Sequence, residues 1–274
     1  MTRGERAGEL PAPPDPLAVP VLDSHCHLDI VGRDVGEQLA AARAVGVDTV
    51  VQVGVDLDSS RLSATVAEEH DDVWAAVALH PNEAGRGAAT PAALAEIESL
   101  AGLPQVLAVG ETGLDHYRTG EEGRGPQEES FRAHIAIAKR TGTTLVIHDR
   151  DAHEDVLRVL AEEGAPERVV FHCFSGDAAM ARTCAAAGWF LSFAGNVTFT
   201  NAGNLREAAA VTPAELLLVE TDAPFLTPMP YRGRPNASYL VPLTMRALAQ
   251  VRDDDLDELC AAVAANGRRA FALP

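Results

Sequence analysis

Short apolar runs alternate with longer amphipathic stretches along most of this chain. The runs are rich in Val, Ile, Leu and Ala and are bounded by turn residues, a pattern typical of buried strands in a parallel sheet. We expect strands over residues 21–28, 49–55, 73–80, 106–113, 144–150, 168–174, 189–195 and 216–222. Eight parallel strands, each followed by a helix, are what a closed barrel requires.

The stretches between these runs have the apolar spacing of helices. We expect helices over residues 35–45, 59–70, 91–100, 127–140, 152–163, 177–187, 204–210, 238–251 and 256–271. Pro91 and Pro126 stand where a helix start tolerates proline, and the acidic run at residues 253–255 is placed to cap the last helix. The pattern predicts an α/β protein with a (β/α)8 TIM barrel as its single domain over residues 21–274. Residues 1–20, rich in Pro, Gly and charge, are predicted to form a short disordered tail.

Composition supports one large aliphatic core. The chain has 274 residues, 47% of them hydrophobic and only 5% aromatic. No apolar run approaches the roughly 20 residues of a membrane span, and residues 1–16 lack the apolar stretch of a signal peptide. Four cysteines without CxxC spacing indicate reduced thiols rather than a disulfide framework. We expect a cytoplasmic monomer with no membrane contact and no obligate protein partner.

The net charge limits how the chain can meet nucleic acid. It carries 22 basic and 40 acidic residues, for a formal charge of −18. Such a charge repels polyanions at long range, so a protein that coats DNA nonspecifically is disfavoured. Any contact with DNA must be local.

Polar residues with metal-binding side chains gather at the carboxyl ends of the expected strands. They are His25, His27, Glu111, His148, His172 and Asp222. In a (β/α)8 barrel these strand ends form one face, where active sites are built. Because side chains alternate along a strand, His25 and His27 point to one side while Cys26 points to the other.

Imidazole and carboxylate donors without thiolates suit divalent ions such as Mg, Mn, Zn or Co and disfavour a structural zinc site. The number of ligands indicates two ions. A carboxylate between two ions would let one activate a water and the other polarise a phosphoryl or carbonyl oxygen.

Five ordered motifs carry a family resemblance: HCHLD, GETGLD, VIHDR, HCFSG and ETDAPFL. Together they resemble the TatD family of metal-dependent deoxyribonucleases, within the amidohydrolase-like barrels, over residues 21–270. The resemblance implies that His25, His27 and Asp222 hold one metal ion and that His148 and His172 help to hold a second. It further implies that Glu111 bridges the ions and that Asp222 serves as base for the attacking water. Lys139, the only lysine, falls inside an expected helix, so a carboxylated lysine cannot replace Glu111 as the bridge.

Substrate contacts are expected from residues in the loops after the strands. The candidates are His80, Arg118, Arg150, Arg232, Arg234 and Asn236. A guanidinium group matches phosphate oxygens bidentately, while His80 and Asn236 occupy positions that resemble family positions near the site. A packed loop histidine and solvated surface arginines are the alternatives. The chain departs from the family pattern at His116, Asp149 and Ser238, and His70, His134 and His153 are interpreted as ordinary helix residues.

Three functions are compatible with these residues. The first is a deoxyribonuclease that removes nucleotides from DNA ends, preferring single strands, by attack of a metal-activated water on phosphodiesters. The second uses the same metal site on a small amide or ester, or on D-aminoacyl-tRNA. The third is a noncatalytic scaffold, which the complete ligand set disfavours. Basic and aromatic side chains around the site would favour nucleic acid.

Overall fold

The computed structural model describes residues 9–273. Its strands are β1 Val21–Cys26, β2 Val47–Val53, β3 Val73–Val77, β4 Val106–Asp115, β5 Thr144–Arg150, β6 Val169–Phe171, β7 Phe190–Phe193 and β8 Leu217–Val219. They form one eight-stranded sheet in chain order. A parallel bridge between Cys26 and Ala223 brings the segment after β8 beside the end of β1. The predicted (β/α)8 barrel is therefore confirmed.

Helices follow the strands as the amphipathic pattern indicates. They are α1 Val35–Arg43, α2 Leu57–Glu69, α3 Pro81–Ala84, α4 Pro91–Ala101, α5 Glu121–Thr141, α6 His153–Glu163, α7 Ala178–Ala186, α8 Gly203–Val211, α9 Val241–Arg252 and α10 Leu256–Phe271. Three short 3-10 helices are η1 Gly195–Thr198, η2 Ala214–Leu216 and η3 Ser238–Leu240.

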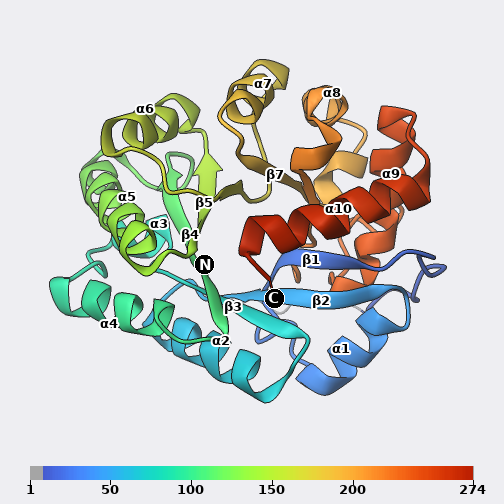
Figure 1. The fold of residues 1–274 in the computed structure, drawn as a ribbon, viewed down its shortest axis with the longest axis horizontal. Coiled ribbons are helices and arrows are strands. Elements are labelled where there is room, and N and C mark those ends of the chain that lie inside the picture. Colours follow the sequence, from blue (N-terminus) through green and yellow to red (C-terminus); the bar gives the residue numbers. More distant parts are fainter. Residues whose placement is uncertain (1–8, 274) are drawn as a thin grey trace. The chain divides into compact units, whose positions relative to one another are not determined.

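The chain divides into two compact units. One comprises the residues up to Val51 together with Gly176–Gly267, and the other comprises Gln52–Ser175 with the residues from Arg268 onward. In the second unit, α4, α5 and α6 lie outside β3, β4 and β5 (Figure 1). Their inward side chains, such as Ile97 and Phe131, are fully buried. In the first unit, Leu39 and Leu248 fill the same role for α1 and α9.

Short polar side chains begin several of these helices. Asp34, Asp56 and Asp177 each accept a backbone N–H of the following first turn. At α10 the expected acidic cap is confirmed for Asp255, whose carboxylate accepts the N–H groups of residues 257 and 258. Asp253 instead ends α9 in a left-handed conformation.

Helix α5 begins earlier than its sequence pattern predicts. Pro126 was expected near the first position, but the helix starts at Glu121 and contains the proline. Glu121 and Glu122 lie in the first turn, where the helix dipole favours acidic side chains. The added turn extends α5 toward the end of β4, and short α3 follows β3 where no helix was expected.

The N-terminal segment is held in place from residue 9 onward, which differs from the disordered tail expected for residues 1–20. The Arg234 guanidinium donates to the carbonyls of Glu9 and Leu10, and the Tyr239 hydroxyl donates to that of Pro11 at 2.6 Å. Arg246 donates to the carbonyls of Asp15 and Pro16. The side chains of Arg234, Tyr239 and Arg246 thus bind backbone carbonyl groups that would be hydrated in a disordered tail. Residues 1–8 lie outside the described residues.

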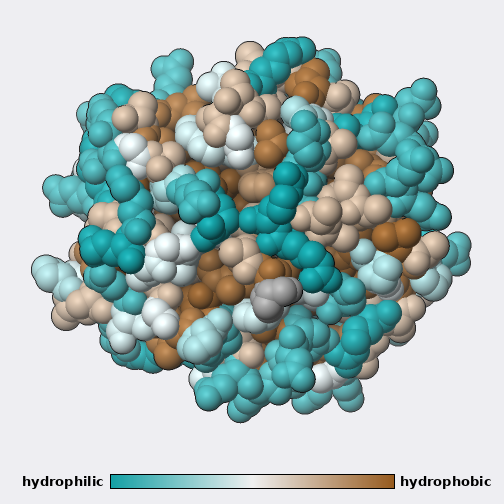
Figure 2. All heavy atoms as spheres, viewed as in Figure 1, coloured by the Kyte–Doolittle hydropathy of each residue, from teal (hydrophilic) through white to brown (hydrophobic). Residues whose placement is uncertain are grey.

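Hydrophilic side chains are spread over the face shown in Figure 2, with smaller hydrophobic areas between them. Within residues 9–273, no helix combines the length and the hydropathy that a bilayer span needs.

Candidate metal centre

The first unit brings His25, His27 and Asp222 together. The Asp222 carboxylate lies 3.9 Å from Nε2 of His25 and 3.6 Å from Nε2 of His27. Both imidazoles are buried, whereas the aspartate side chain keeps 16% of its surface exposed. The three predicted ligands therefore form one buried cluster with an open carboxylate.

Backbone pairing fixes this cluster. The N–H of Asp222 donates to the carbonyl of His25, and the N–H of His27 donates to the carbonyl of Ala223, each at 2.9 Å. Asp222 has a φ of 51°, a left-handed conformation that is unusual for a residue with a side chain. The segment after β8 is thus tied directly to the HxH segment.

Buried polar residues support the same segment. The Asp23 carboxylate accepts the N–H of Thr221 at 2.9 Å and its hydroxyl at 2.5 Å. The side-chain amide of Asn236 donates to the carbonyls of Thr221 and Phe225. Asn236 is fully buried, so its observed role is structural, and the substrate contact expected from the sequence stays a prediction.

The second unit brings Glu111, His148 and His172 together at the ends of β4, β5 and β6. The Glu111 carboxylate lies 3.1 Å from Nδ1 of His148 and 2.8 Å from Nε2 of His172. The two imidazole nitrogens are 3.3 Å apart. Burial disfavours the charged form of Glu111, but the charge of His172 and hydrogen bonds from His148 and His172 lower its pKa well below its usual range.

Asp115 orients His148, and sequence reasoning missed it. The Asp115 carboxylate lies 3.3 Å from Nε2 of His148 and accepts the backbone N–H of Arg118 at 2.8 Å. Although burial opposes ionisation, these hydrogen bonds lower the pKa of Asp115 to about 2. In the neutral ring that a cation requires, the ionised carboxylate keeps the proton of His148 on Nε2, which leaves Nδ1 as the coordinating atom toward the cluster. The available signal was its place in GETGLD, four residues after Glu111 on the same strand.

His80 contacts the same cluster in a different role. Its Nδ1 accepts the backbone N–H of Asn82 at 3.0 Å, and its Nε2 lies 3.7 Å from the Glu111 carboxylate. Burial lowers the pKa of His80 to about 3, so the imidazole is neutral near pH 7. Because Nδ1 accepts a hydrogen bond, the single ring proton is on Nε2. His80 is therefore placed to donate a hydrogen bond at the cluster, although its ring nitrogen also lies within 4.8 Å of ligand atoms of Glu111 and His148.

Both clusters fit a divalent cation. The donor atoms of His25, His27 and Asp222 all lie within 4.8 Å of one another. In the second cluster the donor atoms of Glu111, His148 and His172 are separated by 2.8 to 3.3 Å. Imidazole nitrogens combined with an ionised carboxylate are the donors that Zn, Mn and Co accept, and thiolates take no part.

The predicted arginine contacts divide into two groups. The Arg150 guanidinium lies over the exposed Tyr117 ring, 4.0 Å from its centre, and Arg232 lies over Phe199 at 4.2 Å. Arg118 is exposed on the loop after β4. In contrast, the Arg234 guanidinium group already donates to the backbone carbonyls of Glu9 and Leu10. Contact of Arg118, Arg150 and Arg232 with a substrate stays a prediction.

Two departures from the family pattern, Asp149 and His116, have local partners. The Asp149 carboxylate accepts a hydrogen bond from Nδ1 of His153 at 2.7 Å, and His116 lies 3.9 Å from Asp155. Ser238 is buried at the start of η3. His153 is therefore more than an ordinary helix residue.

His134 also has a specific role, contrary to its interpretation as an ordinary helix residue. Its Nε2 accepts the backbone N–H of Leu79 at 3.1 Å, and its Nδ1 donates to the carbonyl of Ser130 at 2.7 Å. Burial lowers the pKa of His134 to about 4, which keeps the ring neutral. The side chain thereby fastens α5 to the backbone immediately before His80.

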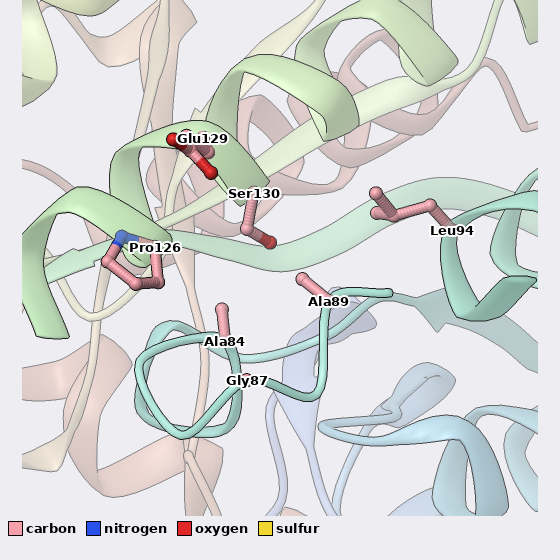
Figure 3. Close-up of a pocket in the computed structure, with 7 residues that line it drawn as sticks. All are labelled: Ala84, Gly87, Ala89, Leu94, Pro126, Glu129 and Ser130. Atoms are coloured by element: carbon pink, nitrogen blue, oxygen red, sulfur yellow. The ribbon is translucent and has the colours of Figure 1, made fainter. Parts of the chain in front are cut away.

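A separate cleft of about 280 Å³ opens beside α5 (Figure 3). Its lining residues are Ala84, Gly87, Ala89, Leu94, Pro126, Glu129 and Ser130. None of them belongs to either cluster, and most are small and apolar. The cleft therefore contains none of the clustered metal-binding side chains.

A (β/α)8 barrel with histidine and carboxylate clusters at its strand ends defines the amidohydrolase-like class of metal-dependent hydrolases. Residues 22–272 match the family model described as TatD related DNase. The chain belongs to this family.

Relatives and solved structures agree with this assignment. A protein of Mycobacterium tuberculosis described as the uncharacterized metal-dependent hydrolase TatD is 50% identical, covering 92% of this chain and 98% of its own. The 3′-5′ ssDNA/RNA exonuclease TatD of Erwinia tasmaniensis is 33% identical, covering 88% and 95%. The crystal structure of YJJV, a TatD homolog from Escherichia coli, superposes with a TM-score of 0.86 at 26% identity, covering 93% and 98%.

Proposed function

We propose that this protein is a divalent-metal-dependent deoxyribonuclease that removes nucleotides from the ends of single-stranded DNA. The observation that carries the proposal is the pair of buried clusters, each with converging imidazole and carboxylate donors. We assign one ion to His25, His27 and Asp222, and a second to Glu111, His148 and His172. Removing such donors from water without a cation to pair them would be costly.

The bound ions would supply an activated water nucleophile and polarise the scissile bond. Asp222, the more exposed carboxylate, accepts the proton of the attacking water. Glu111 is ionised, and its carboxylate lies between His148 and His172. That it bridges the two ions stays a prediction from the family resemblance.

His80 contributes a hydrogen-bond donor to the same reaction. Its Nε2–H faces the cluster while Nδ1 is fixed by the N–H of Asn82. A fixed neutral donor suits a phosphoryl oxygen on which negative charge develops, because it needs no reorganisation during the reaction. This role agrees with the phosphate contact expected for His80.

The choice of DNA as substrate has two supports. A relative that is 33% identical is named as an exonuclease acting on single-stranded DNA and RNA from the 3′ end. Exposed Arg118, together with Arg150 beside Tyr117, provides local positive charge at the end of β4 and β5 in a chain whose net charge is −18. We accordingly propose local contacts to a strand end rather than a continuous basic groove.

The test uses metal-stripped protein and single-stranded DNA labelled at either end. Addition of Mg, Mn, Co or Zn should produce a ladder of stepwise shortened 5′-labelled strands, the pattern of removal from the 3′ end. Glu111→Gln should abolish the ladder, and Glu98→Gln, which changes a surface ion pair with Arg140, should not. Metal binding without cleavage of DNA would overturn the nuclease and direct attention to small amides, esters and D-aminoacyl-tRNA.

A further inference from the structure

Tyr117 is an exposed aromatic side chain without a packing role. Its relative exposure is 64%, the highest among the exposed large hydrophobic side chains of residues 9–273. The Arg150 guanidinium lies 4.0 Å from its ring centre and so covers one face. Because most of the ring is exposed and Arg150 covers only one face, the second face is available to a ligand.

The backbone fixes this pair relative to the Glu111 cluster. The N–H of His116 donates to the carbonyl of Arg150 at 2.9 Å, and Asp115 pairs with Arg150 in the register of β4 and β5. Arg150 follows His148 by two residues on β5, so both side chains leave the strand on the same side. At roughly 3.3 Å per residue, Arg150 lies about 7 Å beyond the metal ligand along the strand.

We propose that Tyr117, backed by Arg150, is a stacking platform for a nucleobase of the substrate strand next to the phosphodiester that is cleaved. This inference rests on the proposed nuclease function and names the side chains that recognise the strand. Stacking accepts every base because each has a π face, so the platform gives affinity without sequence preference. The attraction between the guanidinium and the ring quadrupole holds the Tyr117 ring in place beside Arg150.

A stacking contact also suits the charge of this protein. Phosphate contacts to an acidic chain are weakened by long-range repulsion, whereas base stacking depends on contact area. The platform therefore supplies affinity that the net charge of −18 does not supply.

The test compares steady-state hydrolysis of a single-stranded oligonucleotide by the wild type, Tyr117→Ala, Tyr117→Trp and Leu103→Ala. Loss of one base–aromatic stack is expected to raise KM about 10- to 100-fold for Tyr117→Ala with little change in kcat. Tyr117→Trp should restore KM. Leu103→Ala, a truncation of another exposed apolar side chain, should behave as the wild type.

An oligonucleotide with abasic nucleotides at its cleaved end gives the second readout. With no base to stack, the wild type and Tyr117→Ala should have the same KM. A Tyr117→Ala KM within twofold of the wild type on the normal strand would overturn the platform while leaving the nuclease intact. Failure of the wild type to cleave any strand would instead overturn the proposed function, so the two failures are distinct.

Discussion

Asp115 shows how a carboxylate outside the ligand set can determine the chemistry of a ligand. Its contact with Nε2 of His148 selects the tautomer whose Nδ1 faces Glu111 and His172. Such partners of metal-binding histidines typically contribute 10- to 100-fold in metal affinity. The Glu111 cluster therefore depends on a residue that touches none of the proposed ions.

We predict that Asp115→Asn weakens binding of one of the two ions by about 10- to 100-fold and leaves the other unchanged. The cause is loss of the charge that holds the His148 proton on Nε2. Competition with a metal chelator measures both affinities. Asp155→Asn is the matched control because its carboxylate lies 3.9 Å from His116 and is half exposed. Equal affinities for Asp115→Asn and the wild type would contradict the role.

His80 allows hydrogen-bond donation to the substrate to be tested separately from metal binding. We predict that His80→Ala lowers kcat about 100-fold or more, as loss of one fixed donor to a developing oxyanion does. The number of bound ions should stay the same, because Nδ1 of His80 is engaged by the N–H of Asn82. Elemental analysis of the purified variant beside its kinetics distinguishes the roles. Loss of an ion would show that His80 is a ligand after all.

The sequence reveals the ligands more readily than their partners. The predicted ligands His25, His27, Glu111, His148, His172 and Asp222 stand out because metal-binding side chains at strand ends converge in a barrel. Asp115 does not stand out, because an aspartate after a strand is also an ordinary turn residue. The tautomer of His80 depends on a backbone N–H two residues away, which only the folded chain places.

Strand β4 approaches β5 closely where the second cluster is built, and Gly113 permits this approach. Its φ is +134°, and a Cβ atom there would lie 2.2 Å from the carbonyl oxygen of His148. Neither the backbone conformation nor the space admits a side chain. The contact holds β4, which carries Glu111, against the backbone that carries His148.

We predict that Gly113→Ala lowers the free energy of unfolding by about 3 kcal/mol or more, through backbone strain and overpacking. Gly125→Ala, at an exposed position of α5, is the control, because an added Cβ there meets nothing within 4 Å. It should raise stability by up to about 1 kcal/mol, since alanine favours helix. Urea denaturation measures both. A Gly113→Ala protein as stable as the wild type would contradict the close approach.

The boundaries of the helices were predictable from the sequence, except where tertiary contacts determine them. The pattern identifies α4, α6 and α10 to within two residues, because their apolar faces pack on the sheet. It places the start of α5 six residues late, since proline was interpreted as a start signal. It also gives no sign that His134 would fasten α5 to the backbone before His80.

The barrel as a whole followed from repetition of one local pattern. Eight buried strands separated by amphipathic stretches leave few arrangements other than a closed parallel sheet. The attachment of residues 9–17 was not predictable, because Pro-rich and charged segments are usually disordered. Here arginine and tyrosine side chains from distant positions bind its carbonyl groups.

Titration of metal-stripped protein with Mn or Zn, followed simultaneously by bound equivalents and by the rate of single-stranded DNA hydrolysis, tests the proposed metal-dependent nuclease most directly. We predict two bound ions per chain and a rate that rises from zero as the sites fill. Asp222→Asn and Glu111→Gln should each lose an ion and the activity. Hydrolysis that persists without bound metal, or two full sites with no cleavage of DNA under any of these metals, would contradict it.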